Sequence, residues 1–421
     1  MDLQTLTKYA EEFIQRLCIQ IPTRHLGSEG NRLAASFFDD WMLAQGMTLE
    51  QQHFECQDWE GEGASLTVAG ETFTIFPSPH SLGCQVTAPL IVATTLDELN
   101  TADARGQVLL LRGPIASTQL MPTNFPFYYP DEHRTIFEAL EAAQPAAILT
   151  ATAPCPQIAG AQYPLQMIED GNFDLPSVYL TEEEGERLAS YTGQTAVLVS
   201  HARRIPSHGW NSIARLNPAA TQRIVLCAHI DTKPNTPGAL DNAAGITTLM
   251  LLGSLLAQES LRLSVEIVSL NGEDHYAAKG ETVYLESVRD RLEEIALVVN
   301  LDGLGFIESD TAYSLYGCPE DLAALIKEIM RAHPGLLEGD AWYQGDHTMF
   351  IQQGLPALAL TSADLGNLLN QITHTPADSP EKVDPRCLAS VALALHNLLK
   401  ALDKHLAKGV GGLRVKIAIS S

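Results

Sequence analysis

The sequence predicts an α/β protein in which a mostly parallel, mixed sheet is sandwiched by helices and a β-rich domain is inserted into the chain. Two observations predict this fold. From about residue 206 onward, strand-like runs alternate with helix-like segments, and the runs are continuously apolar, as in strands buried on both faces. Between about 59 and 205 the pattern changes to short β-type runs separated by turns.

Residues 1–58 are predicted to supply two helices to the main domain. The first has apolar residues at helical spacing and is expected to end before Pro22. In the second, Ser28 is expected to cap the N-terminus and Gly46 to stop the helix. The first residues lack the basic start and continuous apolar centre of a signal peptide, so we expect a cytoplasmic protein.

Residues 59–205 are predicted to form the inserted β-rich domain. A helix-like segment at 133–144 lies among its β-type runs, which are 64–70, 88–94, 106–113, 146–154, 177–181 and 195–200.

Residues 206–421 are predicted to form the main sheet and its covering helices. The strand-like runs are 223–230, 265–272, 296–303 and 355–362. The helix-like segments are 243–258, 321–332 and 386–406. The tail at 407–421 fits either a frayed end or an edge strand.

Charge and composition limit the partners of the chain. The 421 residues include 26 Lys and Arg against 51 Asp and Glu, a formal net charge of −25, which disfavours binding to nucleic acid or to an anionic membrane. No run approaches the roughly 20 apolar residues of a membrane span. The seven Cys residues are scattered and form no CxxC pair, which argues against a disulfide framework or a Cys-type zinc site.

Polar residues gather where the predicted parallel strands end. The carboxyl ends of such strands meet at one edge of a sheet, where ligands bind. We therefore expect seven side chains to converge there: His229, Asp231, Asp241, Glu273, Asp274, Asp302 and His374.

Imidazole and carboxylate ligands without Cys suit zinc, or a similar divalent ion, in a catalytic site. Two such ions need a bridging carboxylate, and a further carboxylate must take the proton of the attacking water. His229 and Asp231 point to the same side of one strand, so Asp231 can orient the imidazole. Taken singly, Asp241 also suits a helix cap and Asp302 a turn, but their joint placement at strand ends favours a metal site.

Four motifs carry a resemblance to a known family. The segments AHIDTKPNTPGALDNAAG, NGED, NLDG and HTPADSPEKVD are similar to those of the zinc aminopeptidases that include bacterial leucyl aminopeptidase, glutamate carboxypeptidase II and glutaminyl cyclase. The segment RHLGSEGNRLAASFF also resembles the opening segment of that family. The resemblance implies the zinc exopeptidase fold and two zinc ions per chain. His229 and Asp302 would hold one zinc, Asp274 and His374 the other, and Asp241 would bridge them.

The same resemblance implies roles outside the ligand set. Glu273 would act as general base and then as general acid, and Asp231 would orient His229. The module at 59–205 resembles a protease-associated domain, which shapes access to the cleft or contacts substrate.

Three positions depart from the family pattern or extend it. The family usually has Glu-Glu where this chain has Glu273-Asp274, a change that zinc tolerates because Asp and Glu are both ordinary ligands. Glu281 stands where relatives carry a small residue; it could bind a substrate ammonium group or be a solvated helix residue. His347 in GDHTMF is a candidate for substrate contact, with packing as the alternative.

The sequence therefore predicts a co-catalytic dizinc exopeptidase, an aminopeptidase that acts on peptide substrates. A glutaminyl cyclase-like acyltransferase, which works with one zinc, is one alternative. A carboxypeptidase is another, and it would need Arg residues around its substrate. A non-catalytic, receptor-like homologue would show lost ligands, and none of the seven residues is lost here.

Overall fold

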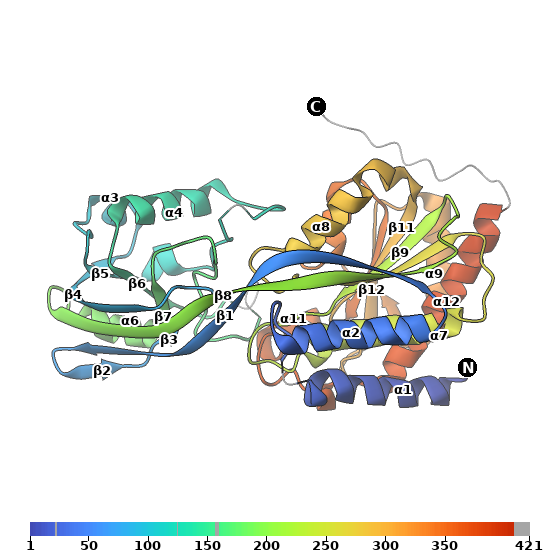
Figure 1. The fold of residues 1–421 in the computed structure, drawn as a ribbon, viewed down its shortest axis with the longest axis horizontal. Helices are drawn as coiled ribbons and strands as arrows, with labels where there is room; N and C mark the ends of the chain where they lie inside the picture. Colours follow the sequence, from blue (N-terminus) through green and yellow to red (C-terminus); the bar gives the residue numbers. More distant parts are fainter. Residues whose placement is uncertain (22, 124, 156–159, 408–421) are drawn as a thin grey trace. The chain divides into compact units, whose positions relative to one another are not determined.

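The structure is a computed structural model that describes residues 1–21, 23–123, 125–155 and 160–407 (Figure 1). The chain forms two compact units. The main unit comprises Met1–Phe54, His208–Leu368 and Ile372–Ser421, and the inserted unit comprises Glu55–Ser207 with Leu369–Gln371. Pro22 and most of the tail, from 408 onward, lie outside the described residues.

The strands of the main unit are β1 (Thr48–Val68), β8 (Thr195–Leu216), β9 (Arg223–His229), β10 (Ser264–Leu270), β11 (Ile295–Leu301), β12 (Thr311–Tyr316), β13 (Leu336–Glu338) and β14 (Ala357–Ser362), of which β1 and β8 continue into the inserted unit. Its helices are α1 (Leu3–Gln15), α2 (Glu29–Ala44), α7 (Ala244–Leu256), α8 (Lys279–Val288), α9 (Glu320–Arg331), α10 (His347–Gln352), α11 (Leu365–Gln371) and α12 (Pro385–Ala407), of which α11 ends in residues counted with the inserted unit. Shorter helical segments are η1 (Arg16–Gln20), η3 (Ala239–Ala243), η4 (Arg289–Glu294) and η5 (Pro380–Lys382).

The main sheet is mixed and parallel at its centre, as the sequence predicts. Its order is β13-β12-β14-β11-β9-β10-β8. The inner strands β14, β11, β9 and β10 are parallel neighbours, whereas β12 and β8 pair antiparallel at either side of them. All residues of β9, β10 and β11 are buried, because helices cover both faces of these strands.

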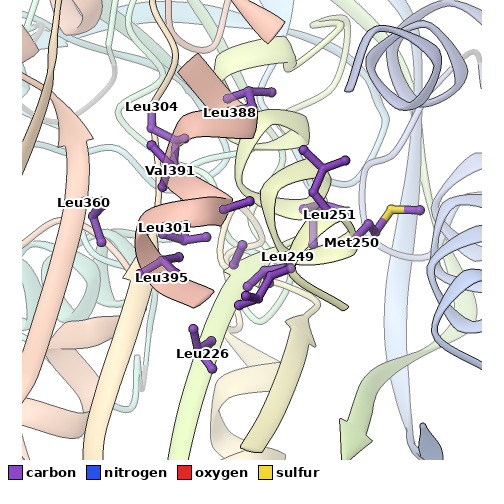
Figure 2. Close-up of a cluster of buried hydrophobic side chains, with 14 of the residues drawn as sticks. Leu226, Leu249, Met250, Leu251, Leu301, Leu304, Leu360, Leu388, Val391 and Leu395 are labelled. Carbon is purple, nitrogen blue, oxygen red and sulfur yellow. The ribbon is translucent and has the colours of Figure 1, made fainter. Parts of the chain in front are cut away.

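The core of the main unit lies between the sheet and the helices α1, α2, α7, α9 and α12, which pack on one face. Helices α8 and α10 lie against the other face, where α8 contacts β10 and α10 contacts β11 and β14. Figure 1 shows α8 on the side of the sheet away from α1 and α2. Figure 2 shows how α7 and α12 meet the strands: Leu249 and Leu395 lie near Leu226 of β9 and Leu301 of β11. Burying one such leucine contributes about 1.5–3 kcal/mol to the free energy of folding, so this contact holds α7 against the inner strands of the sheet.

Local signals in the N-terminal part are confirmed. The side chain of Ser28 accepts a hydrogen bond from the Asn31 amide at 3.0 Å and caps α2, which ends just before Gly46. Gly46 has a φ of 80°, a conformation that favours glycine.

The segment Ala239–Leu256 is long and apolar enough for a membrane span, but it is 89% buried, as a core helix would be.

The inserted unit has a sheet of its own. Its further elements are β2 (Glu71–Phe73), β3 (Phe76–Pro77), β4 (Cys84–Ala93), α3 (Leu96–Thr101), β5 (Val108–Leu111), η2 (Gly113–Ala116), α4 (Asp131–Ala143), β6 (Ala147–Thr152), β7 (Ser177–Thr181) and α6 (Glu182–Ala189). Strands β4, β5, β6 and β7 are parallel neighbours, and β8 and β3 pair antiparallel with β4 and β7. Alternate residues of β5 enter two separate apolar clusters, so both faces of this sheet are covered. Its likeness to a protease-associated domain stays a prediction.

Gly245, in the first turn of α7, provides a test of this packing. A Cβ atom there would lie 2.3 Å from Asn242 Oδ1 and 2.7 Å from the Leu301 carbonyl oxygen. We expect Gly245→Ala to lower the free energy of unfolding by about 1–3 kcal/mol, because α7 must move away from the sheet. In the exposed helix α11, Gly366→Ala is the matched control, since its Cβ would meet only Asp364 Oδ1 at 3.9 Å. Equal stability of the two variants in urea unfolding would contradict the prediction.

Candidate metal centre

Adjacent parallel strands bring the candidate ligands to one edge of the main sheet. His229 is the last residue of β9, Asp274 lies in the turn after β10, and Asp302 directly follows β11. His374 follows α11, which comes after β14 in the chain. Because β10, β9, β11 and β14 are parallel neighbours, their carboxyl ends lie side by side.

Asp241 lies between two imidazoles. Its Oδ1 is 3.1 Å from His229 Nε2, and its Oδ2 is 3.1 Å from His374 Nε2. Asp302 Oδ1 lies 3.7 Å from His229 Nε2, and Asp274 Oδ1 lies 3.3 Å from His374 Nε2. Two His–Asp pairs therefore share the carboxylate of Asp241.

These residues fit a divalent metal ion. One ligand atom from each of His229, Asp241 and Asp274 lies within 4.8 Å of the other two. His229 is fully buried, and among the described residues its Nε2 has no hydrogen-bond partner of acceptable geometry. A buried imidazole nitrogen without a hydrogen-bond partner lowers the stability of the fold unless another group, such as a metal ion, binds it. Nitrogen and carboxylate donors without sulfur suit zinc in an open, catalytic site.

Asp231 acts on this set differently from the expectation. Its carboxylate Oδ1 lies 3.8 Å from His229 Nδ1, whereas its backbone carbonyl oxygen accepts a hydrogen bond from Nδ1 at 3.1 Å. The carboxylate instead accepts from the amides of Gly272 at 2.7 Å and Asp274 at 3.0 Å. The main chain of Asp231 thus fixes the tautomer of His229, and its side chain holds the turn that carries Asp274.

Opposed charges shift the pKa values of the ligands. Burial alone would lower the pKa of His229, but the adjacent Asp241 and Asp302 raise it well above its usual value. The pKa of His374 is likewise raised against burial, by Asp274 and Asp241. Burial would raise the pKa of Asp241, but the two imidazoles lower it far below its usual range. The metal-free centre therefore holds protons on its imidazoles, and a bound cation would take over their positive charge.

Glu273 precedes Asp274 in the turn after β10. Burial raises the pKa of Glu273 well above its usual value; the charge of His229 opposes this shift, and the charges of Asp274 and Asp302 add to it. A carboxyl group whose pKa is raised toward the working pH is suited to take and return a proton.

Asp346 is a feature of the centre that sequence reasoning missed. It is 3% exposed, and among the described residues neither of its carboxylate oxygens has a hydrogen-bond partner. Burial raises the pKa of Asp346 to about 7; His229 opposes the shift and Asp302 adds to it. Its place directly before His347 in the GDH segment was the one signal in the sequence.

Glu281 is not a solvated helix residue, so that alternative was wrong. It is 4% exposed in the first turn of α8, and its Oε2 lacks a hydrogen-bond partner among the described residues. Burial raises the pKa of Glu281 well above its usual value, and the charge of Asp346 adds to the shift. One turn further along each helix, the rings of Tyr284 and Phe350 pack 5.7 Å apart, so the starts of α8 and α10 are neighbours. The expected contact of Glu281 with a substrate ammonium group stays a prediction.

His347 is engaged in packing. It is fully buried, its Nδ1 accepts from Asn300 Nδ2 at 3.2 Å, and its Nε2 donates to the Trp342 carbonyl oxygen at 2.9 Å. Burial lowers the pKa of His347 to about 4, so the ring is neutral at pH 7. Both ring nitrogens have partners, which favours packing over the expected contact with substrate.

Comparison with known proteins relates part of the chain to one peptidase family. Residues 211–399 match the model of peptidase family M28. This segment is of the M28 peptidase family. The resemblance to zinc aminopeptidases inferred from the sequence is thereby confirmed.

The M28 segment has curated relatives of low identity. A probable lipoprotein aminopeptidase, LpqL of Mycobacterium tuberculosis, is 21% identical over 81% of this chain and 66% of its own length. Leucine aminopeptidase 2 of Trichophyton equinum is 26% identical over 47% of this chain and 43% of its own length. The matches thus span less than two thirds of either relative. A lipoprotein relative gives no support to the expected cytoplasmic location, which stays a prediction.

Solved structures share the fold of this chain. An aminopeptidase from Aneurinibacillus sp. strain AM-1 superposes with a TM-score of 0.73 at 19% identity, covering 94% of this chain and 93% of that one. The zinc aminopeptidase of Bacillus subtilis superposes with a TM-score of 0.71 at 19% identity, and the match covers 99% of both chains. A glutaminyl cyclase of Porphyromonas gingivalis gives 0.52 at 14% identity, over 94% of this chain and 98% of that one. At these identities the likeness shows the fold.

The raised pKa of Asp346 makes a prediction for the metal-free protein. The folded-state pKa of about 7 lies above the ordinary 3.8, so the folded protein keeps a proton that the unfolded chain releases between these pH values. Stability contributed by the protonated group is therefore lost as pH rises through this window. We expect Asp346→Asn to gain stability relative to the wild type between pH 4 and pH 8, measured by urea unfolding with a chelator present. The exposed Asp290→Asn is the control, and an equal pH trend in both variants would refute the prediction.

Proposed function

We propose that this M28 homologue is a co-catalytic dizinc exopeptidase that removes N-terminal residues from peptides. In this proposal His229 and Asp302 hold one zinc, Asp274 and His374 hold the other, and Asp241 bridges them. The observation that carries the proposal is the position of Asp241, whose two oxygens each lie 3.1 Å from an imidazole nitrogen, one of His229 and the other of His374. A carboxylate placed in this way is what a pair of metal ions about 3.5–4 Å apart requires.

Charge balance also supports two ions rather than one. When ionised, Asp241, Asp274 and Asp302 carry three negative charges, and a single divalent ion would leave one of them uncompensated. Two divalent ions offset all three and leave positive charge for the neighbouring Glu273. A buried site tolerates little uncompensated charge, so the carboxylate count favours a pair of ions.

The chain itself supplies the proton transfers of the proposed reaction. When bound, the two zinc ions would polarise a peptide carbonyl, make water a better nucleophile and lower the pKa of Glu273. Glu273 takes the proton of the attacking water and returns it to the amine that leaves as the peptide bond breaks. Asp231 keeps His229 in one tautomer and holds the Glu273–Asp274 turn in place.

Replacing Glu273 tests the role of the proton carrier. We expect Glu273→Gln to lower kcat on aminoacyl-nitroanilides by about 100-fold to 10,000-fold, because an amide cannot take the proton. Zinc content should stay at the wild-type level, since Glu273 is not in the proposed ligand set. The exposed Glu11→Gln controls for loss of a carboxylate elsewhere. Full activity in Glu273→Gln would refute the mechanism.

Metal removal and substrate choice test the proposed activity itself. We expect dialysis against a chelator to abolish release of nitroaniline, and zinc to restore it with a break at two equivalents per chain. Peptides with a free N-terminus should be cleaved and N-blocked peptides should not. A break at one equivalent together with cyclisation of N-terminal glutamine would support an acyltransferase instead. Unchanged hydrolysis by the metal-free protein would contradict the proposal.

A further inference from the structure

Arg24 is a buried cation close to the candidate metal centre. It is 2% exposed, and its guanidinium donates hydrogen bonds to four backbone carbonyl oxygens. Three of the acceptors belong to the loop between His229 and Asp241, namely Ile230 at 3.1 Å, Pro237 at 2.8 Å and Gly238 at 2.8 Å. The fourth is Leu17 in the helical segment η1, at 2.8 Å. Burying a guanidinium is costly, so its placement here indicates a specific task.

Asp378 holds the next part of the same loop by accepting hydrogen bonds, where Arg24 donates them. It is fully buried, and its carboxylate accepts from the amide of Leu240 at 2.7 Å and from the amide of Asp241 at 3.1 Å. Its backbone carbonyl oxygen accepts from the Ala239 amide at 3.2 Å. Asp378 lies four residues after His374, so the loop that carries one imidazole holds the loop that carries the shared carboxylate.

Together these contacts engage both kinds of polar backbone group in the loop, its carbonyl oxygens and its amides. Arg24 donates to the carbonyl oxygens of residues 230, 237 and 238, and Asp378 accepts from the amides of residues 239, 240 and 241. Neither side chain is one of the proposed metal ligands. Each acts through the main chain on where the Asp241 carboxylate stands.

We propose that Arg24 and Asp378 are positioning residues that set the Asp241 carboxylate between His229 and His374 before any metal binds. This proposal rests on the dizinc function proposed above. It assigns a task to the N-terminal segment, which contributes no ligand. Groups that orient ligands without touching the ion contribute about 10-fold to 100-fold to metal affinity, and we assign Arg24 and Asp378 to that group.

The test measures zinc affinity of the full chain rather than activity. Arg24→Met removes the donors while keeping the length of the side chain, and Asp378→Asn keeps one acceptor but turns the other toward the amides as a donor. We expect each variant to bind zinc about 10-fold to 100-fold more weakly in competition with a chromophoric chelator. Because both residues hold one loop, the double variant should lose less than the product of the two single effects.

A matched control separates positioning from general stability. Arg204 in the inserted unit also donates to backbone carbonyl oxygens, of His80 at 2.6 Å and of Phe173. We expect Arg204→Met to leave zinc affinity unchanged whatever it does to stability. In metal-free Asp378→Asn, the amides of Leu240 and Asp241 should exchange hydrogen faster than in the wild type, and added guanidinium ion at non-denaturing concentration should partly restore zinc binding to Arg24→Met.

Each outcome decides for or against the positioning role. Wild-type zinc affinity and wild-type exchange of the two amides in both folded variants would overturn it. If Arg24→Met does not fold, Asp378→Asn alone decides by the same two measurements. The proposed function fails separately: a wild-type protein that binds zinc but cleaves no peptide refutes the peptidase and leaves the positioning role standing. A wild-type protein that binds no zinc refutes both.

Discussion

The shared carboxylate of Asp241 is the constraint on which the rest of the centre depends. Its two oxygens meet imidazoles at 3.1 Å on either side, and such a position tolerates little movement of the main chain. The residues after Asp241 are tied down as closely as those before it. Asn242 donates to the Leu301 carbonyl oxygen at 2.7 Å and accepts from the Gly245 amide at 3.0 Å. The start of α7 is thereby joined to the end of β11, where Asp302 follows.

Much of the fold and the ligand set follows from local sequence. Continuously apolar runs identified β9, β10, β11 and β14, because strands covered by helices on both faces have no polar alternation. Once those strands are parallel neighbours, the residues at their carboxyl ends must meet, which is why His229, Asp274 and Asp302 could be brought together without coordinates. The cap of α2 by Ser28 was predictable for the same reason, since it depends on a hydrogen bond within four residues.

The remainder depends on contacts between distant parts of the chain. Period-two geometry places Asp231 on the side of His229, but a difference between 3.8 Å and 3.1 Å decides whether its carboxylate or its carbonyl oxygen meets the imidazole. The burial of Glu281 and Asp346 arises from the packing of α8 on α10, and charged residues in first helical turns are usually solvated. The four carbonyl partners of Arg24 come from loops whose course no short motif specifies.

The contacts around the Asp241 loop also have a consequence for how the protein is made. Arg24 and Gly238 are 214 residues apart in the chain, and Asp241 and Asp378 are 137 apart, so the centre has a very high contact order. During synthesis, a nascent chain that ends before His374 has His229 and the loop but lacks both His374 and Asp378, the residue that holds the loop amides. A ribosome-bound chain of that length therefore cannot form the contact between His374 and Asp241, and the two imidazoles meet the shared carboxylate only after residues 374–378 have emerged.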